Sequence, residues 1–238
     1  MAALPIATVE TPQIRIHRMY ASGRYIQVPE RSFRAVNAAL RSAVLDDERR
    51  FVGSDPLRVK DLADRPPRPP GWGFVYRLVP SPRLTSASTE VVSALIPALT
   101  LFPGGNDGET WFSVTLRVRK ATPIGIADLF ADPSRGLKAL AAAARKRLIA
   151  TDPAVRNALS DPKLGASFAR GLLPRPENYQ HFALTDDGLI LGFDNSQVTW
   201  PAAGRRETTV PYSVIRLFLS PIGQELIKGV RRPRSFRG

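Results

Sequence analysis

The chain has 238 residues and contains no cysteine. It therefore cannot form a disulfide, a thiolate metal site or a cysteine nucleophile, and burial of apolar side chains has to stabilise the fold. A hydrophobic content of 43 %, with three tryptophans and eleven phenylalanines, is sufficient for a core at this length. Two histidines are too few for a multi-histidine metal centre. We expect a globular protein that holds no metal ion and no other cofactor.

Apolar residues follow strand-like and helix-like periods in successive segments. The period of two predicts strands over residues 14–16, 25–28, 74–79, 85–96, 110–118 and 208–210. Helical spacing predicts amphipathic helices over residues 33–44, 134–149 and 212–219. A β-hairpin is predicted over residues 182–193, with its turn at Asp186, Asp187 and Gly188. Because strands and helices do not alternate regularly, we expect an α+β fold with mainly antiparallel sheets packed with two or three amphipathic helices.

Composition divides the chain into three parts. Residues 1–71 are expected to form an N-terminal strand–helix segment that ends in a proline-rich connection over residues 65–71. Residues 72–227 are expected to form the main domain and to build one compact unit together with the N-terminal segment. Residues 228–238 hold five Lys and Arg and no acidic residue, so we expect a mobile basic tail.

The net charge predicts an anionic partner. Thirty-four Lys and Arg against 21 Asp and Glu give a formal charge of +13, which attracts nucleic acid, anionic lipid or an acidic envelope polymer. A basic cluster at residues 145–147 is predicted on the outer face of a helix, where ordinary solvation explains it. The candidate anion contacts are Arg117, Arg119, Lys120, Arg205 and Arg206. The tryptophans in or beside Gly- or Pro-rich segments are candidate surfaces for sugar stacking: Trp72, Trp111 and Trp200.

A serine hydrolase is the enzymatic alternative. Ser167 lies in the stretch 165–169, which approaches the nucleophile-elbow pattern Gly-x-Ser-x-Gly but ends in alanine. His181 follows in the sequence, and Asp186 or Asp187 could orient its ring. A cell-wall-associated esterase that uses Ser167 and His181 therefore stays open, although the βα alternation of that hydrolase fold is missing.

The sequence shows no membrane-spanning or secretory segment. The longest apolar stretch, residues 91–102, is interrupted by serine, proline and threonine, whereas a spanning helix needs about 20 apolar residues. The first residues lack the basic and apolar regions of a signal peptide.

The second half of the chain resembles the RsiV-like domain family over about residues 74–220. The segments that carry the resemblance are residues 91–95, the Gly104-Gly105 loop, the Trp111 strand, residues 126–130, the helix that ends at Leu148, residues 178–193, Gln197-Val198, Gly204 and residues 210–213. The resemblance implies that residues 72–227 form an RsiV-like domain, secreted or associated with the cell envelope. The family includes the ectodomain of the anti-sigma factor RsiV, which binds lysozyme, and secreted mycobacterial antigens. It has no universal catalytic residues.

Residues and resemblance together predict a non-enzymatic extracytoplasmic binding module of the bacterial cell envelope. Its expected partner is an envelope polysaccharide or another anionic polymer, and nucleic acid stays open as a partner. Lysozyme is disfavoured because the common animal lysozymes are strongly basic and a chain of charge +13 would repel them. Two alternatives remain: a cell-wall-associated serine esterase, and the sensor ectodomain of an anti-sigma factor.

Overall fold

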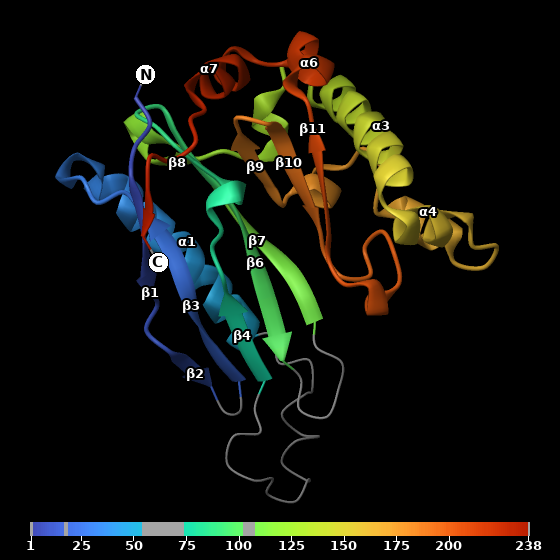
Figure 1. Ribbon diagram of the computed structural model, residues 1–238, viewed down its shortest axis with the longest axis horizontal. Helices are drawn as coiled ribbons and strands as arrows, with labels where there is room; N and C mark the ends of the chain where they lie inside the picture. The colour runs from blue at the N-terminus through green and yellow to red at the C-terminus, as the bar shows by residue number, and fades with distance from the viewer. Residues whose placement is uncertain (1, 17–18, 54–73, 102–107, 238) are drawn as a thin grey trace, which may run out of the picture.

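The computed structural model describes residues 2–16, 19–53, 74–101 and 108–237. Over these residues the protein is an α+β fold with mostly antiparallel sheets, as predicted (Figure 1). The predicted proline-rich connection and the Gly104-Gly105 loop lie outside the described residues.

Strands build two sheets in this part of the chain. The larger sheet contains β1 (Ile6–Glu10), β2 (Ile14–Ile16), β3 (Met19–Gln27), β4 (Phe74–Leu78), β5 (Thr85–Ala87), β6 (Val91–Leu101), β7 (Gly108–Arg117), β8 (Thr122–Pro123) and β12 (Phe236–Arg237). The smaller sheet contains β9 (Phe182–Thr185), β10 (Gly188–Phe193) and β11 (Arg206–Val210). The larger sheet has the main order β12-β1-β3-β4-β6-β7-β8, and the smaller one has the order β11-β10-β9.

Helices flank the two sheets. The α-helices are α1 (Arg34–Gly53), α3 (Pro133–Thr151), α4 (Pro153–Ser160), α5 (Gly165–Arg170), α6 (Tyr212–Ile215) and α7 (Pro221–Gly229). The 3-10 helices are η1 (Arg31–Phe33), η2 (Pro82–Leu84), η3 (Val118–Lys120), η4 (Ile126–Leu129), η5 (Pro176–Tyr179), η6 (Pro201–Ala203) and η7 (Arg216–Phe218). The predicted long helices correspond to α1 and α3, and the predicted helix over residues 212–219 is the short α6 followed by η7.

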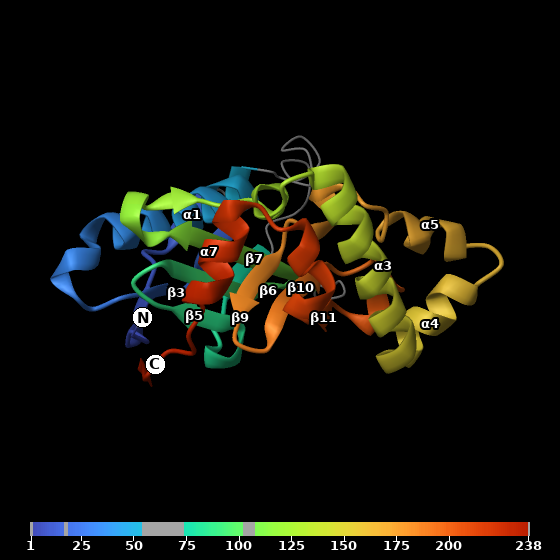
Figure 2. The ribbon, with the colours of Figure 1, turned by 90° about the horizontal axis from the view of Figure 1, so that it is seen from above.

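The elements form four layers, in the order α1, larger sheet, smaller sheet, α3. Helix α1 connects the parallel strands β3 and β4, and it buries apolar residues spaced by four positions against one face of the larger sheet. On the opposite face, Trp111 and Leu95 pack against Ala183 and Ile190 of the smaller sheet. Figures 1 and 2 place α1 and α3 toward opposite ends of the long axis of the molecule.

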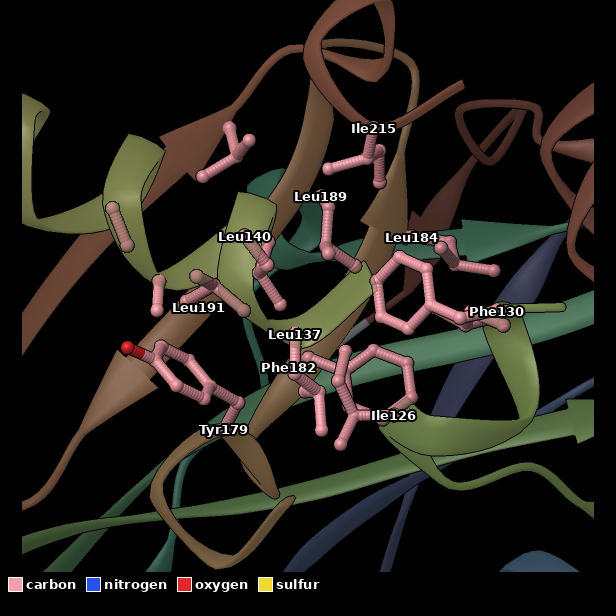
Figure 3. Packing of buried hydrophobic residues seen from close by; sticks show 14 of the residues in the cluster. Ile126, Phe130, Leu137, Leu140, Tyr179, Phe182, Leu184, Leu189, Leu191 and Ile215 are labelled. Carbon is pink, nitrogen blue, oxygen red and sulfur yellow. The ribbon is translucent and has the colours of Figure 1, made fainter. Parts of the chain in front are cut away.

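The second core lies between α3 and the smaller sheet. Strands β9 and β10 alternate, so that Phe182, Leu184, Leu189 and Leu191 face α3 while the residues between them face the larger sheet. Figure 3 shows these side chains in one cluster with residues from α3 and η4. Strands β9 and β10 are therefore buried on both faces and are mostly apolar, whereas the polar β11 is only partly buried.

The C-terminal residues lie along the larger sheet, so the expectation of a mobile tail is wrong for the described part. Strand β12 pairs in parallel with β1, with Ile6 opposite Phe236. Before it, the backbone of Arg231 exchanges hydrogen bonds with the Ser86 hydroxyl at 3.0 and 3.1 Å. Arg232 forms ion pairs with the aspartates of the β9–β10 turn at 3.2 Å. Local sequence could not reveal this docking, because all these contacts join distant segments.

Candidate functional site

Trp111, a predicted stacking surface, is a buried contact between the two sheets. Its side chain is 5 % exposed, and its indole N–H donates a hydrogen bond of 3.0 Å to the carbonyl of Arg206. A Cβ added at Gly192 would lie 2.7 Å from Trp111 Cγ, so the glycine lets the ring lie flat against β10. The ring therefore joins β7 to β10 and β11 and presents little surface to a ligand.

Two of the predicted anion contacts, Arg205 and Arg206, lie beside the Trp111 indole. The Arg205 guanidinium lies 4.9 Å from the centre of the Trp111 ring and forms an ion pair of 2.9 Å with Glu109. Arg206 forms an ion pair of 2.9 Å with Asp152, at the N-terminus of α4. The structure thus brings Trp111, Arg205 and Arg206 together, as an internal junction with acids of the same chain.

The other predicted cations lie at the far end of β7. Arg117 is half-buried and forms hydrogen bonds of 2.7 and 2.9 Å with the Glu225 carboxylate of α7. Arg119 forms an ion pair with Glu90 at 3.4 Å. Lys120 is exposed and has no ion pair with the described residues. An anionic ligand would have to compete with acids of the protein for all but one of the five predicted cations.

The remaining predicted tryptophans give no stacking platform in the described residues. Trp200 is half-buried, and its ring meets the edge of Phe168 with ring centres 5.7 Å apart. Trp72 lies outside the described residues.

The two residues of the esterase alternative have different partners. Ser167 is exposed on α5, and its hydroxyl accepts a hydrogen bond of 3.0 Å from Arg170. The His181 ring contacts Asp194 at 3.2 Å and the Gln180 amide at 3.2 Å. Among the described residues, no hydrogen bond joins Ser167 to His181, and Asp194 takes the orienting position that the sequence suggested for the hairpin aspartates.

Two acids of α1, the buried Glu48 and the partly buried Asp47, form a polar cluster that the sequence analysis missed. Glu48 is fully buried, and one of its carboxylate oxygens accepts a hydrogen bond of 2.7 Å from the Thr11 hydroxyl. Its second oxygen has no hydrogen-bond partner among the described residues. Asp47 accepts a hydrogen bond from the Tyr76 hydroxyl and pairs with Arg50 at 3.1 Å.

Burial raises the pKa of both carboxyl groups in this cluster. Burial raises the pKa of Glu48, and the hydrogen bond from Thr11 opposes the rise only in part. Burial also raises the pKa of Asp47, against the opposing effects of Tyr76 and Arg50. The spacing of the sequence could have identified Glu48, because it continues the four-residue repeat of Val36, Leu40 and Val44 on the buried stripe of the helix.

Helix α3 carries several basic side chains that form no ion pair with the described residues. This helix contains Arg135, Lys138 and the basic run 145–147, and no acidic residue. None of these five side chains forms an ion pair with the described residues. Residues 133–179 together hold nine Lys and Arg against three Asp and Glu. The helices in this segment therefore carry an excess of positive charge.

A groove of about 590 Å³ runs between α3 and α6 beside these cations. Its lining residues are Ala139, Ala142, Ala143, Lys146, Arg147, Ala150, Thr151, Pro211 and Val214, which we call the α3 groove. The other α3 members follow Ala139 by three, four, seven, eight, eleven and twelve positions, so they lie on one stripe of the helix. The alanines leave the stripe open, and the two cations project beside it.

The described residues show no further site of these kinds. No group of three or more His, Asp or Glu side chains in them could hold a metal ion. Among the helices described, none has the length and apolarity needed to cross a membrane.

Comparison with known proteins supports the fold. Residues 127–213 match the model of a family described as "Protein of unknown function (DUF3298)". The chain is similar to the crystal structure of a DUF3298 family protein from Pseudomonas aeruginosa, with a TM-score of 0.54 and 14 % identity, over 93 % of this chain and 96 % of that one. A DUF3298 family member from Bacteroides fragilis gives a TM-score of 0.53 and 12 % identity, over 94 % and 97 %. The search of curated proteins found no match.

These matches support the expected resemblance at the level of the DUF3298 region and of the fold that surrounds it. The narrower assignment to the RsiV-like group stays a prediction. The two structural neighbours share too little sequence to transfer any residue role.

Proposed function

We propose that the protein is a non-enzymatic binding module of the bacterial cell envelope, which holds an anionic polymer along the α3 groove. The observation that carries the proposal is the run of cations on α3 that have no ion pair with the described residues and lie beside an open groove. The proposal keeps the predicted class of ligand and moves its contacts to α3. Its extracytoplasmic location rests on the family resemblance.

Charge supports this placement. Most of the cations predicted from the sequence already form ion pairs with the chain's own acids, and a ligand would have to break those contacts. Lys146 and Arg147 lie in the groove, are exposed, and form no such pair. A carboxylate or phosphate can therefore approach them without displacing an internal partner.

Shape supports a polymer as the ligand. Ala139 and Ala150 are eleven positions apart on the helix, which corresponds to about 16 Å along the axis. Alanine side chains end at Cβ, so the floor is low and apolar and can contact the apolar face of a sugar ring. Charged groups at intervals along an extended polysaccharide could then reach the two cations at the side of the floor.

The test is binding of the purified protein to polygalacturonate, neutral dextran and DNA, over a series of salt concentrations. The double variant Lys146→Glu with Arg147→Glu should lower the affinity for polygalacturonate by about tenfold or more, because each reversal replaces an attraction with a repulsion. The matched control is Arg34→Glu with Arg41→Glu, which changes the net charge equally on exposed positions of α1.

Equal losses in both double variants would contradict the proposal, since they would show that net charge alone attracts the polymer. Equal affinity for DNA and polygalacturonate, lost in parallel as salt rises, would also contradict a site for a shaped polymer. The location is tested separately, by fractionating cells of the source bacterium and detecting the protein in the cytoplasmic and envelope fractions.

A further inference from the structure

The outer edge of β7 is unpaired over its middle part. On one side β7 pairs with β6 along its whole length, but on the other side β8 reaches only Leu116 and Arg117. Toward the start of the strand, Asp194 covers the edge by accepting a hydrogen bond of 2.8 Å from the N–H of Trp111. Between these two contacts no described strand lies beside β7.

The register shows which backbone groups face outward. The N–H of Trp111 bonds to Asp194, and the carbonyl of Thr115 accepts a hydrogen bond of 2.9 Å from Ile124, so both residues face away from β6. Every second residue of an antiparallel strand faces the same neighbour, so the N–H and C=O of Ser113 also face outward. No described residue forms a hydrogen bond with either group.

A crevice of about 400 Å³ opens at this edge. Its walls come from α1, from β7, from the β8–η4 connection and from η5, and they include the apolar side chains of Ile124, Ile126 and Phe182. The Ser113 hydroxyl donates a hydrogen bond of 3.0 Å to the carbonyl of Gln180, which fixes one wall beside the strand. Glu177 is the charged residue among those that line the crevice.

We propose that this edge binds an extended peptide of a partner protein by strand addition. The peptide residue opposite Ser113 would exchange two backbone hydrogen bonds with it, and an aliphatic neighbour would enter the crevice between Ile126 and Phe182. A Lys or Arg of the peptide would lie near Glu177. An unpaired strand edge selects an extended backbone, because only this conformation presents donors and acceptors at the matching interval.

Charge complementarity sets the chemistry of the peptide. The protein carries a net charge of +13, yet the crevice lining carries a carboxylate and no cation. The Glu177 carboxylate therefore attracts a basic peptide to the crevice, whereas an acidic peptide would be attracted to the cations of α3. The inference is independent of the proposed polymer function, because the two surfaces share no residue.

The probe is a blocked hexapeptide of alternating valine and lysine, titrated into the full-length protein and followed by NMR. Binding should shift the amide signals of Ser113 and Thr115 and slow their hydrogen exchange. A version with glutamate in place of lysine should bind about tenfold more weakly, because it meets Glu177 with a like charge. A version N-methylated at the central lysines should also lose about tenfold, because their N–H groups are the ones that face Ser113 in the added strand.

Protein variants test the same contact from the other side. Ser113→Pro removes the outward N–H but no hydrogen bond to β6, and it should abolish peptide binding. Ser113→Ala keeps the N–H and should retain binding within about threefold. The N-methylated peptide keeps the test decisive if the proline variant does not fold, since it is measured on the unchanged protein.

Several results would overturn the inference. The first is no binding at millimolar concentrations of the peptide. The second is equal affinity for the N-methylated and the unmodified peptide. The third is slowed hydrogen exchange only at amides other than those of Ser113 and Thr115. A concentration-dependent dimer that protects Ser113 without any peptide would show that a second copy of this chain occupies the edge, and would equally overturn it.

Discussion

Replacing Trp111 separates its structural role from the ligand contact that the sequence suggested. The indole is 5 % exposed, packs against Gly192, and donates its N–H to the carbonyl of Arg206. Trp111→Ala should therefore lower the free energy of unfolding by about 4 kcal/mol, the usual cost of emptying a buried aromatic site. This is a large share of the 5–15 kcal/mol that stabilises a typical domain, roughly enough to leave a marginal protein partly unfolded.

Trp111→Phe gives the finer measurement. The phenyl ring keeps most of the packing but cannot donate the hydrogen bond, and it leaves space where the second ring lay. We expect a loss of about 2 kcal/mol, of which about 1 kcal/mol comes from the missing hydrogen bond. Urea denaturation followed by circular dichroism measures both variants, and an unchanged m-value would confirm that the midpoint shift reports stability.

The phenylalanine variant should bind polygalacturonate as tightly as the unchanged protein, because the α3 groove does not include position 111. The reasoning would be refuted if Trp111→Phe left the free energy of unfolding within about 0.5 kcal/mol of its original value, as a surface substitution does. A simultaneous loss of polymer affinity would show that the indole is a stacking surface after all.

Three further predictions follow from buried and strained positions. Glu48→Gln should raise stability at pH 7 but change it little near pH 4. Burial raises the pKa of the Glu48 carboxyl in the folded protein, so the folded state loses stability as the pH rises above the pKa that this carboxyl has in the unfolded chain. The amide of glutamine does not ionise and therefore removes this loss. Unfolding curves across this pH range measure the difference, and an equal effect at both pH values would contradict it. Gly188→Ala should cost about 1–2 kcal/mol in a thermal melt, because Gly188 has a φ of +138° and an added Cβ would lie 2.6 Å from the carbonyl oxygen of Val210. Arg117→Met should cost about 1–3 kcal/mol in urea, because it leaves the half-buried Glu225 without its cation; no loss would mean that solvent satisfies Glu225.

Local patterns in the sequence predicted much of the fold. The hairpin of β9 and β10 was predicted because its turn residues and apolar runs lie within a dozen positions. The two long helices were predicted because their buried stripes repeat over several turns. The short helices α4 and α5 were missed, because eight and six residues contain too few turns to show a period. Strand β12 was missed because its partner β1 lies at the other end of the chain.

The candidate site was harder to predict than the fold, because residue type does not show which acid a cation meets. Arg206 pairs with Asp152 and Arg117 with Glu225, and in each case the partner lies in another element far along the sequence. The cations of α3 had a usable local signal, since the helix contains five of them and no acid. The absence of any acidic residue between the first and last residues of α3 separates this helix from one whose cations have acidic neighbours on the same face.

The pairing of β1 with β12 affects the order in which the fold can assemble. Ile6 and Phe236 are neighbours in the sheet although almost the whole described chain separates them. During synthesis β1 therefore emerges long before β12, and the β1 edge that pairs with β12 stays open until β12 has been made. Contacts of such long sequence separation form slowly, because a long loop must close before they contribute any stability. The partly made protein thus exposes a strand edge to other chains, and a chaperone that shields extended segments would protect it during that interval.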